Sequence, residues 1–490
     1  MNVRDGFEGG ITEARFRFGG CLLQYKWTVL TVTTVGVLMA GIDSRILLIG
    51  FPQIASALGA DVEQTIWFTQ AYVLGSTVAL LLIGRITDIV GRVKVYTSGF
   101  LIFTIGSALT SLAQVPVQAI LFRSVQGLGA AILFTNSVAM IVDATPKNER
   151  GLALGINQLA FRFGAMAGLT ISGVILSFLD WRALFYINVP IGIFGTVWAH
   201  CRLKEIASLE KGAPIDWVGF IAFTVSITSF LLALTFAAYG VAEQITAYEL
   251  LVASVISLGI FVAYERRSKY PLLDLSLLRI REFTGGIIAQ LLNTIAWGAV
   301  LILLSFYFQL VLGLTPLEAG VRIIPFEIAF LATGPLSGKL SDRFGHLPFT
   351  TSGLALTSIS LYLFSTADEF TPYSQIVIYM ILLGAGLGMF VSPNISSIMS
   401  SVPAHRTGIA SAFRAVLFNV GFTISLNFAV LVMTFTVPYA LVTKMVSSTI
   451  IIPEVDKELF LGGLKNTYLW LALLNTLAIP PSMLRGATNR

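Results

Sequence analysis

Two similar charged segments interrupt a chain that is otherwise strongly apolar: "LLIGRITDIVGRVKVY" at residues 81–96 and "GPLSGKLSDRFGHLP" at residues 334–348. Only 12% of the 490 residues are charged, whereas 56% are hydrophobic. The two segments align at an offset of 254 residues, and the matched pairs are Gly84 with Gly338, Asp88 with Asp342, and Gly91 with Gly345.

Two more pairs of segments repeat in the same order, each at an offset of 257 residues. "QGLGAAILF" at 126–134 resembles "LGAGLGMFV" at 383–391, and "PKNERG" at 146–151 resembles "PAHRTG" at 403–408. Three ordered matches at nearly one offset indicate an internal duplication. The chain is therefore predicted to contain two homologous halves.

The apolar runs between these segments predict helices that cross a membrane. A run of about 20 apolar residues spans a hydrocarbon core of about 30 Å, and in lipid the backbone groups must be satisfied within the run, as they are in a helix. The alternating pattern of a membrane barrel is absent. Fourteen spans are predicted, at about 27–50, 63–83, 95–113, 116–142, 150–178, 183–203, 216–238, 248–265, 283–310, 316–338, 349–366, 372–400, 406–436 and 467–484.

The positions of the basic residues predict the orientation of these spans. With the N-terminus inside, 22 of the 31 Lys and Arg residues fall in cytoplasmic segments and four fall in external loops. An even number of spans returns the C-terminus to the same side, so both termini of a multi-pass protein of the cell membrane are predicted to be cytoplasmic. The first 26 residues lack the pattern of a cleaved signal peptide. The net charge of +5 follows from this bias and does not indicate a nucleic-acid partner.

The predicted spans divide into six, two and six. The predicted organisation is a cytoplasmic tail (1–26), an N-terminal six-helix bundle (27–203), a linker with two extra helices (204–282), a C-terminal six-helix bundle (283–484) and a second cytoplasmic tail (485–490). Duplicated bundles of this kind are typical of secondary transporters. The predicted fold class is an all-α membrane protein with two pseudo-symmetric bundles.

The chain offers little material for an active site or a metal centre. Its three histidines are scattered along the chain, and its two cysteines, Cys21 and Cys201, are far apart in sequence. We therefore expect no enzyme activity, no cofactor and no metal site. A membrane sensor without transport activity would need a soluble module, and no predicted loop is long enough to form one.

On its motifs the sequence resembles the major facilitator superfamily, and most closely its fourteen-helix drug/proton antiporter branch. In that family the loop after helix 2 reads Gly-x-Leu-Ala-Asp-Arg-x-Gly-Arg-Lys. The first copy here keeps Gly84, Asp88, Gly91 and Arg92 but has Ile89 in place of a basic residue, and the second copy keeps Gly338, Asp342, Arg343 and Gly345. The helix 4 motif, Arg-x-x-Gln-Gly-x-Gly, is intact from Arg123 to Gly129.

The resemblance implies that both loop copies act as a conformational latch. Their glycines permit tight turns and close approach of helices. Asp88, at the end of a predicted helix, can accept hydrogen bonds from Arg92 or from a neighbouring helix N-terminus. The alternative is an ordinary basic loop with a solvated aspartate.

Ionisable groups at membrane depth are costly and are therefore candidates for function. Seven qualify as groups at membrane depth: Asp43, Arg45, Arg123, Arg162, Arg322, Glu327 and Arg414. In the resembled family the spans that hold them are among those that line a central cavity. Gln126 and Asn136 of the fourth span join Arg45, Arg162, Arg322 and Arg414 as candidates for the substrate cavity.

The two carboxylic acids are the predicted proton-coupling groups, with Arg123 beside them. A carboxyl group balanced between burial and a nearby arginine can take up and release a proton. Asp43 matches the family's acidic position in the first span, and Glu327 lies near the predicted midplane. The alternative is a static lock between an acid and an arginine. Asp43 and Arg45 are two residues apart on a helix and should not pair with each other.

Two of the intramembrane arginines have a possible structural role as the alternative to substrate contact. Arg322 lies four residues after Glu318, so it is predicted either to pair with that residue or to contact substrate. Arg162 is predicted either to contact substrate or to act as a strut between helices.

The family resemblance implies proton-driven export of small amphiphilic compounds, but two features depart from it. In "GAMAGLTISG" (164–173) Leu169 stands where the antiporter motif has proline, so this helix is expected to be straighter. Five intramembrane arginines face only two acids, which favours an anionic substrate. Transport of an organic anion is therefore the alternative. The expected partners are a small-molecule substrate, protons and the lipid bilayer, and a monomer is expected.

Overall fold

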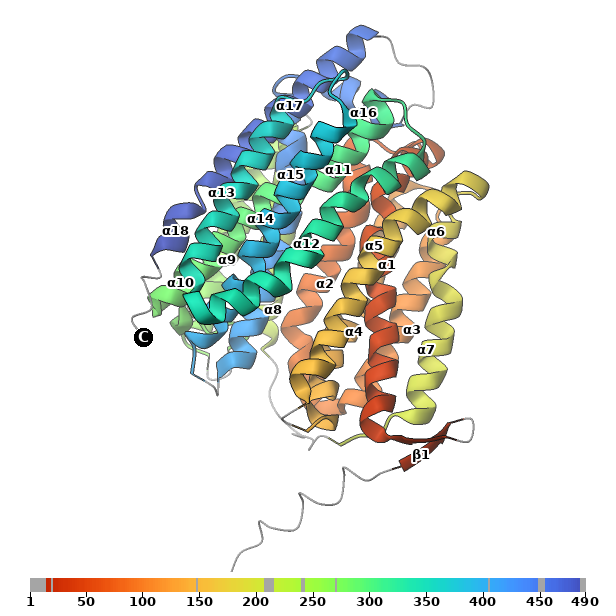
Figure 1. The fold of residues 1–490 in the computed structure, drawn as a ribbon, viewed down its shortest axis with the longest axis vertical. Helices are drawn as coiled ribbons and strands as arrows, with labels where there is room; N and C mark the ends of the chain where they lie inside the picture. Colours follow the sequence, from red (N-terminus) through yellow and green to blue (C-terminus); the bar gives the residue numbers. More distant parts are fainter. Residues whose placement is uncertain are drawn as a thin grey trace, which may run out of the picture.

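The structure is a computed structural model that describes residues 15–18, 21–146, 149–206, 216–238, 243–268, 271–403, 406–447 and 454–484. These residues form a bundle of long helices, with one short β-hairpin beside the start of α1 (Figure 1). We call the end of the bundle that carries this hairpin the inner end, which is the predicted cytoplasmic side, and the opposite end the outer end.

The first part of the chain contains β1 (Arg15–Phe18), β2 (Cys21–Gln24), α1 (Tyr25–Leu58), α2 (Val62–Val90), α3 (Arg92–Ser111), α4 (Pro116–Ala144), α5 (Arg150–Phe178), α6 (Ala183–Tyr186), α7 (Asn188–Arg202), α8 (Trp217–Ala238) and α9 (Gln244–Glu265). The second part contains the 3₁₀ helix η2 (Leu275–Arg279), α10 (Arg281–Trp297), α11 (Val300–Phe306), the π-helix η3 (Tyr307–Val311), α12 (Pro316–Phe344), α13 (His346–Ser365), α14 (Tyr373–Ser400), α15 (Thr407–Thr434), α16 (Tyr439–Ser447), α17 (Glu454–Thr476) and α18 (Ile479–Met483).

Twelve helical stretches among the described residues are long and apolar enough to cross a membrane. This finding confirms the all-helical membrane architecture, but it does not confirm the count of fourteen. The two predicted spans without a counterpart in the twelve coincide with α2 and α17, which have 29 and 23 residues and are also of membrane length.

The predicted bounds of the last span are wrong. The sequence pattern put it at 467–484, whereas α17 runs from Glu454 to Thr476 and α16 forms a short helix before it. The first turns of α17 carry charged residues such as Asp456 and Glu458. A helix can continue beyond the apolar layer at no cost to its backbone bonds, so hydropathy finds only the apolar part of it.

The repeated charged segments occupy equivalent places in the two parts of the chain. Gly91 ends α2 and begins α3 with φ of 109°, and Gly345 ends α12 and begins α13 with φ of 87°. Both values lie in a region that side chains with a Cβ rarely adopt, so the predicted tight turns are present in both copies. Each preceding helix also starts with a capping box, in which the side chain of Asp61 or Thr315 accepts from the backbone three residues on.

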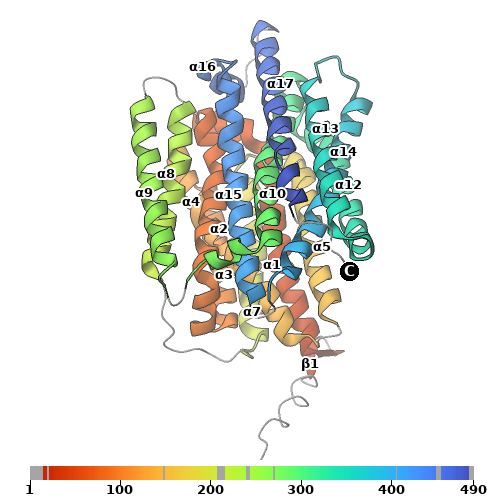
Figure 2. The same cartoon turned by 90° about the vertical axis from the view of Figure 1, so that its left-hand side faces the viewer.

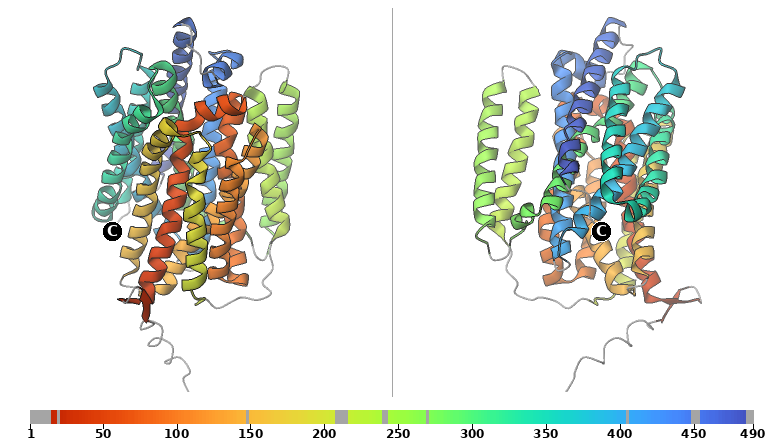
Figure 3. Two further views of the ribbon diagram at one scale, coloured as in Figure 1. Left: turned by 90° about the vertical axis from the view of Figure 1, so that its right-hand side faces the viewer. Right: turned by 60° about the vertical axis from the view of Figure 1, so that its left-hand side comes forward.

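Helices α8 and α9 form a pair at the flank of the bundle, clearly visible in Figures 2 and 3. They pack against each other, and α8 also contacts α2 and α15. The inserted pair therefore lies where a helix of the first part meets a helix of the second part.

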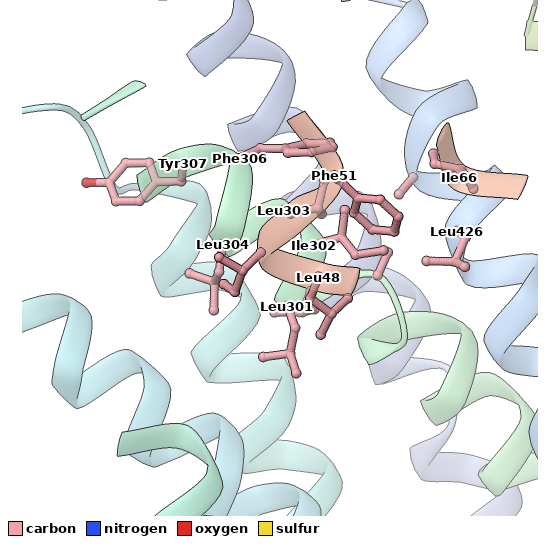
Figure 4. Packing of buried hydrophobic residues seen from close by; sticks show 14 of the residues in the cluster. Leu48, Phe51, Ile66, Leu301, Ile302, Leu303, Leu304, Phe306, Tyr307 and Leu426 are labelled. Atoms are coloured by element: carbon pink, nitrogen blue, oxygen red, sulfur yellow. The ribbon is translucent and has the colours of Figure 1, made fainter. Parts of the chain in front are cut away.

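A continuous apolar cluster closes the outer end of the bundle. We call its central residues, shown in Figure 4, the outer plug: Leu48 and Phe51 of α1, Ile66 of α2, Leu303 and Phe306 of α11, and Leu426 of α15. All six are buried. Since they come from both parts of the chain, the two parts are held together at this end by apolar packing.

Toward the inner end the two parts separate. Gly173 of α5 lies against Leu317 of α12, and Leu169 lies against Gly320. Further inward, Arg162 still contacts Phe330, but the inner ends of α5 and α12 lie apart in Figure 1. The conformation is thus closed at the outer end, with the two parts diverging at the inner end.

Candidate functional site

Helix α1 presents Asp43 and Arg45 to different partners. Asp43 faces α4 within the first part of the chain, where it forms an ion pair with Arg123 at 2.8 Å. Arg45 faces the second part of the chain and lies 3.8 Å from Glu327 of α12. The two residues do not pair with each other, in agreement with their spacing on the helix.

Asp43 lies at the centre of a closed polar network. Its Oδ2 accepts from Arg123 Nη1, and its Oδ1 accepts from Gln126 Nε2 at 2.9 Å and from Asn188 Nδ2 at 3.0 Å. Arg123 also donates to Gln126 Oε1 at 2.7 Å and to the Phe68 carbonyl oxygen at 3.1 Å. The network therefore joins α1, α2, α4 and α7.

Burial of this network is nearly complete. Asp43, Gln126 and Asn188 have no exposed surface, and Arg123 is 2% exposed. The guanidinium of Arg123 lies over the Tyr72 ring, 4.3 Å from its centre. A paired, hydrogen-bonded and buried carboxylate ties helices together. The pairing of Asp43 with Arg123 is the geometry that the static-lock alternative requires, and the choice between that alternative and proton coupling stays a prediction.

A second set of charges lies between the two parts of the chain; we call Arg45, Arg162, Glu327, Trp297 and Phe330 the central cluster. The Arg45 guanidinium lies over Trp297 at 5.8 Å, and that of Arg162 lies over Phe330 at 4.2 Å. Arg162 is also within electrostatic range of both Arg45 and Glu327. Each arginine of the first part thus stacks on an aromatic ring of the second part.

The charges of the central cluster are not saturated by hydrogen bonds. The distance of 3.8 Å between Arg45 Nε and Glu327 Oε1 is too long for a hydrogen bond. Glu327 Oε1 and Trp297 Nε1 are buried and have no hydrogen-bond partner among the described residues. Two guanidinium groups and one carboxylate leave a net charge of +1 if all are ionised, so this cluster can accept a ligand or exchange a proton.

The other cavity candidates lie elsewhere. Asn136 is inside the first part of the chain, where its Oδ1 accepts from Thr87 Oγ1 at 3.0 Å, and Gln126 belongs to the Asp43 network. Arg414 is mostly buried on α15, and its Nε has no partner among the described residues.

The predicted pairing of Arg322 with Glu318 does not form. The carboxylate of Glu318 instead accepts from the backbone N and the hydroxyl of Thr315, both at 2.9 Å, while Arg322 lies over the Tyr373 ring at 4.9 Å. The capping box at the start of α12 forms in preference to the ion pair between Arg322 and Glu318. The partners in the capping box are already fixed by the helix, whereas the Arg322 side chain has to be ordered to reach Glu318.

The latch residues behave differently in the two copies. In the first copy Arg92 forms an ion pair with Asp143 of α4 and donates to the Ala139 carbonyl oxygen at 3.1 Å. The side chains at positions 84 and 88, which include Asp88, lie outside the described residues. In the second copy Asp342 and Arg343 are exposed, and Arg343 lies only against its neighbour Phe344.

Sequence reasoning missed several residues that complete these sites. Asn188 lies in the segment "DWRALFYINVPIG" at 180–192, which carries none of the seven intramembrane charges. Trp297 and Phe330 are apolar residues in apolar spans, and nothing in the sequence marks them as ring partners of arginines. Asp143 lies three residues before the repeated "PKNERG" segment. Its position indicates a partner for Arg92 only when α3 and α4 are known to be neighbours.

The geometry can now be compared with known proteins. Residues 33–426 match the Major Facilitator Superfamily. The chain belongs to this superfamily. It is 32% identical over 406 residues to the riboflavin transporter RibZ of Clostridioides difficile (strain 630), which covers 83% of this chain and 88% of that protein. It is 28% identical over 395 residues to the tetracenomycin C resistance and export protein of Streptomyces glaucescens, which covers 81% and 73% of the two chains.

Solved structures of the superfamily share the fold. The partially occluded inward-open conformation of the xylose transporter XylE from E. coli matches 93% of this chain and 96% of that chain, with a TM-score of 0.61 and 16% sequence identity. At this identity the likeness concerns the fold alone. This member of the Major Facilitator Superfamily is therefore a multi-pass membrane protein with a transport function, and that function is not enzymatic.

Proposed function

We propose that this superfamily member is a proton-coupled secondary transporter that exports small amphiphilic compounds by alternating access. The observation that carries the proposal is the placement of Glu327. It belongs to the second part of the chain, faces two arginines of the first part, and has no hydrogen bond to its Oε1. Such a carboxyl group changes its environment whenever the two parts move relative to each other.

The coupling step follows from that placement. In the conformation described, Arg45 and Arg162 lie close to Glu327, and the outer plug separates the cluster from the outer end. When the parts separate at the outer end, Arg45 and Arg162 move away from Glu327, and the carboxylate then favours uptake of a proton. A proton bound from outside is released at the inner end when the arginines return, and a substrate bound between the same groups moves the other way.

Relatives support export as the direction. One is named for resistance and export of tetracenomycin C, and another is the multidrug resistance protein Stp of Mycobacterium tuberculosis (strain CDC 1551 / Oshkosh). The two aromatic rings of the central cluster, Trp297 and Phe330, suit a flat amphiphilic compound. We also propose the fourteen-helix branch, with α2 and α17 as additional spans in the 6 + 2 + 6 order, both termini cytoplasmic, and a monomer.

Transport of an organic anion is a second candidate, favoured by one specific observation. Neither Arg45 nor Arg162 donates a hydrogen bond to any described residue, and the indole N–H of Trp297 also lacks an acceptor. Unpartnered donors in a buried site are satisfied by a ligand rich in acceptor oxygens. A planar compound with a carboxylate group fits this requirement.

The decisive experiment is Glu327→Gln in proteoliposomes under a pH gradient, with ethidium as a planar cation, fluorescein as a planar anion and riboflavin as an uncharged planar probe. We expect the parent protein to concentrate at least one probe, and Glu327→Gln to lose that accumulation while retaining downhill exchange. The matched control is Glu318→Gln, an exposed position on the same helix where glutamine preserves the capping box.

The outcomes separate the two candidates. Accumulation of ethidium or riboflavin in exchange for protons supports export of amphiphilic compounds. Accumulation of fluorescein alone, in the same direction as the proton, supports the organic anion. If Glu327→Gln keeps full gradient-driven accumulation, Glu327 is not the coupling group and the proposal fails.

A further inference from the structure

Glu63, in the first turn of α2, is a buried carboxyl group that the proposed transport step does not use. It has no exposed surface, and neither of its carboxyl oxygens has a hydrogen-bond partner among the described residues. It lies near the outer end of the bundle and is not part of the central cluster. An unpartnered acid with no exposed surface is unusual and needs a reason.

The surroundings of Glu63 provide no ion-pair partner for a negative charge among the described residues. The Thr235 hydroxyl of α8 lies against its carboxyl group, and Asp61, two residues earlier, adds a like charge. Of the other helices at this end, α4 brings Arg123, which is bound to Asp43, and α16 brings Lys444. Lys444 is 58% exposed and pairs with Asp456, and the described residues of α8 and the outer half of α15 carry no charge.

The hydrogen-bond inventory favours the neutral acid. Thr235 Oγ1 donates its single hydrogen to the Leu231 carbonyl oxygen at 3.1 Å and accepts from Trp67 Nε1 at 2.9 Å. It therefore has a lone pair left but no hydrogen to give. A protonated Glu63 can donate to Thr235 while both of these bonds stay in place, whereas an ionised Glu63 can accept from Thr235 only if the bond to Leu231 is given up. The N-terminal dipole of α2 favours the anion, but its effect is smaller than the cost of burying an unpaired charge.

The same contact leads into a chain of hydrogen bonds that joins three helices. The Leu231 carbonyl of α8 accepts from Asn427 Nδ2 of α15 at 2.9 Å. Asn427 Oδ1 in turn accepts from Gln70 Nε2 of α2. Helix α8 of the inserted pair is thus tied both to α2 and to α15, which belong to different parts of the chain.

We propose that Glu63 is a second proton-binding site, which takes its proton from the outer side and thereby stabilises the closed outer end. Helix α2 contacts both α8 and α15, and its outer plug residue Ile66 lies near Leu426 of α15 (Figure 4). Opening of the plug requires α2 to part from α15, which admits water to Glu63 and lets it ionise. Because Glu63 faces only the outer side, it regulates the conformational equilibrium by external pH and does not carry a proton across.

The test measures opening of the outer end directly. Ile66→Cys, at a position that is 2% exposed, is labelled from outside by a membrane-impermeant maleimide at a series of external pH values and constant internal pH. Glu63 ionises at a lower pH in the open state than in the closed state. Between these two pH ranges, one proton that is bound only in the closed state makes the open fraction rise about tenfold per pH unit. We therefore expect labelling to accelerate as external pH rises.

Two variants in the Ile66→Cys background decide the outcome. Glu63→Gln mimics the neutral acid, and we expect its labelling to stay slow at all pH values; Glu318→Gln is the control that retains the parent's pH dependence. An unchanged pH dependence in Glu63→Gln, or a flat response in the parent, overturns the proposal. Should Glu63→Gln fail to fold, Thr235→Val is the second variant, because it removes the acceptor that we assign to the Glu63 proton. The pH midpoint of labelling must then move to lower pH. A midpoint that stays in place also overturns the proposal.

Failure of the transport proposal can be distinguished from failure of the Glu63 proposal. In the Ile66→Cys background, Glu327→Gln is expected to retain the pH dependence of labelling, although it loses gradient-driven flux. Loss of the labelling response in Glu327→Gln would assign external pH sensing to the central cluster and would overturn the role of Glu63.

Discussion

Replacement of Gln309 by leucine should loosen the outer end of this transporter. Gln309 lies in the π-helix η3, and its Nε2 donates to the Ile49 carbonyl oxygen of α1 at 3.1 Å and to Ser305 Oγ at 2.8 Å. The first of these bonds joins the two parts of the chain inside the apolar surroundings of the outer plug. Nearby, Pro52 interrupts the backbone ladder of α1 because it has no N–H to donate.

The size of the effect follows from that single bond. A buried hydrogen bond between neutral groups contributes about 0.5–1.5 kcal/mol net, and leucine fills much the same volume without the donor. If the bond exists only in the closed state, its loss raises the ratio of open to closed molecules about 2- to 13-fold. Gln309→Glu should have a larger effect, because an ionised carboxylate faces the Ile49 carbonyl as a second acceptor.

The assay is maleimide labelling from outside of Ile54→Cys, an α1 position that is 1% exposed. The matched control is Ser305→Ala, which removes the other partner of Gln309 but leaves the bond to Ile49 in place. We expect faster labelling in Gln309→Leu and parent-like labelling in Ser305→Ala. Equal rates in Gln309→Leu and the parent, or equal acceleration in both variants, would refute the reasoning.

Two further predictions concern ion pairs of very different burial. Asp43→Asn leaves Arg123 without its counter-charge at 2% exposure, so thermal unfolding in detergent should show a loss of about 3–5 kcal/mol; an unchanged melting temperature would mean that the network is not a tie. Asp143→Asn breaks a pair whose side chains are 24% and 27% exposed, so it should cost about 1 kcal/mol or less. Exchange of the two charges, as Arg92→Asp with Asp143→Arg, should recover that loss in a double-mutant cycle.

The helices and the duplication could be predicted from the sequence because both leave periodic or repeated signals. Apolar runs had to be helices in lipid, and the turns at Gly91 and Gly345 had to be glycines because of their positive φ. The start of α17 at Glu454 could not be found in this way, since its first turns are charged and extend beyond the apolar layer.

The partners of the charged residues were less predictable. The spacing of Asp43 and Arg45 showed that they face different ways. Nothing in the sequence, however, indicates that the partner of Arg45 is Glu327, 282 residues away, and not a ligand. One of the two alternatives for Arg322, the pair with Glu318, does not form because a capping box offers Glu318 a better-ordered partner. Pairings across the bundle depend on the relative rotation of packed helices, which small differences in side-chain size decide.

The two repeated segments have the same backbone turn but different side-chain support. In the first part of the chain Arg92 follows Gly91 and binds Asp143 on α4. At the offsets of the duplication, the corresponding positions are His346 and Ser400, so the second part lacks the acid that would complete an equivalent pair. The hydroxyl group of Ser400 donates a hydrogen bond within its own helix, to the Ser397 carbonyl oxygen.

This difference has a mechanical consequence for alternating access. The inner ends of α3 and α4 are braced by a charged pair, whereas those of α13 and α14 depend on close packing, as between Gly353 and Gly386. Close packing of this kind is also present between α3 and α4, as between Gly129 and Phe103, so the ion pair of Arg92 and Asp143 is an additional tie in the first part. We therefore expect the inner ends of α3 and α4 to separate less readily than those of α13 and α14.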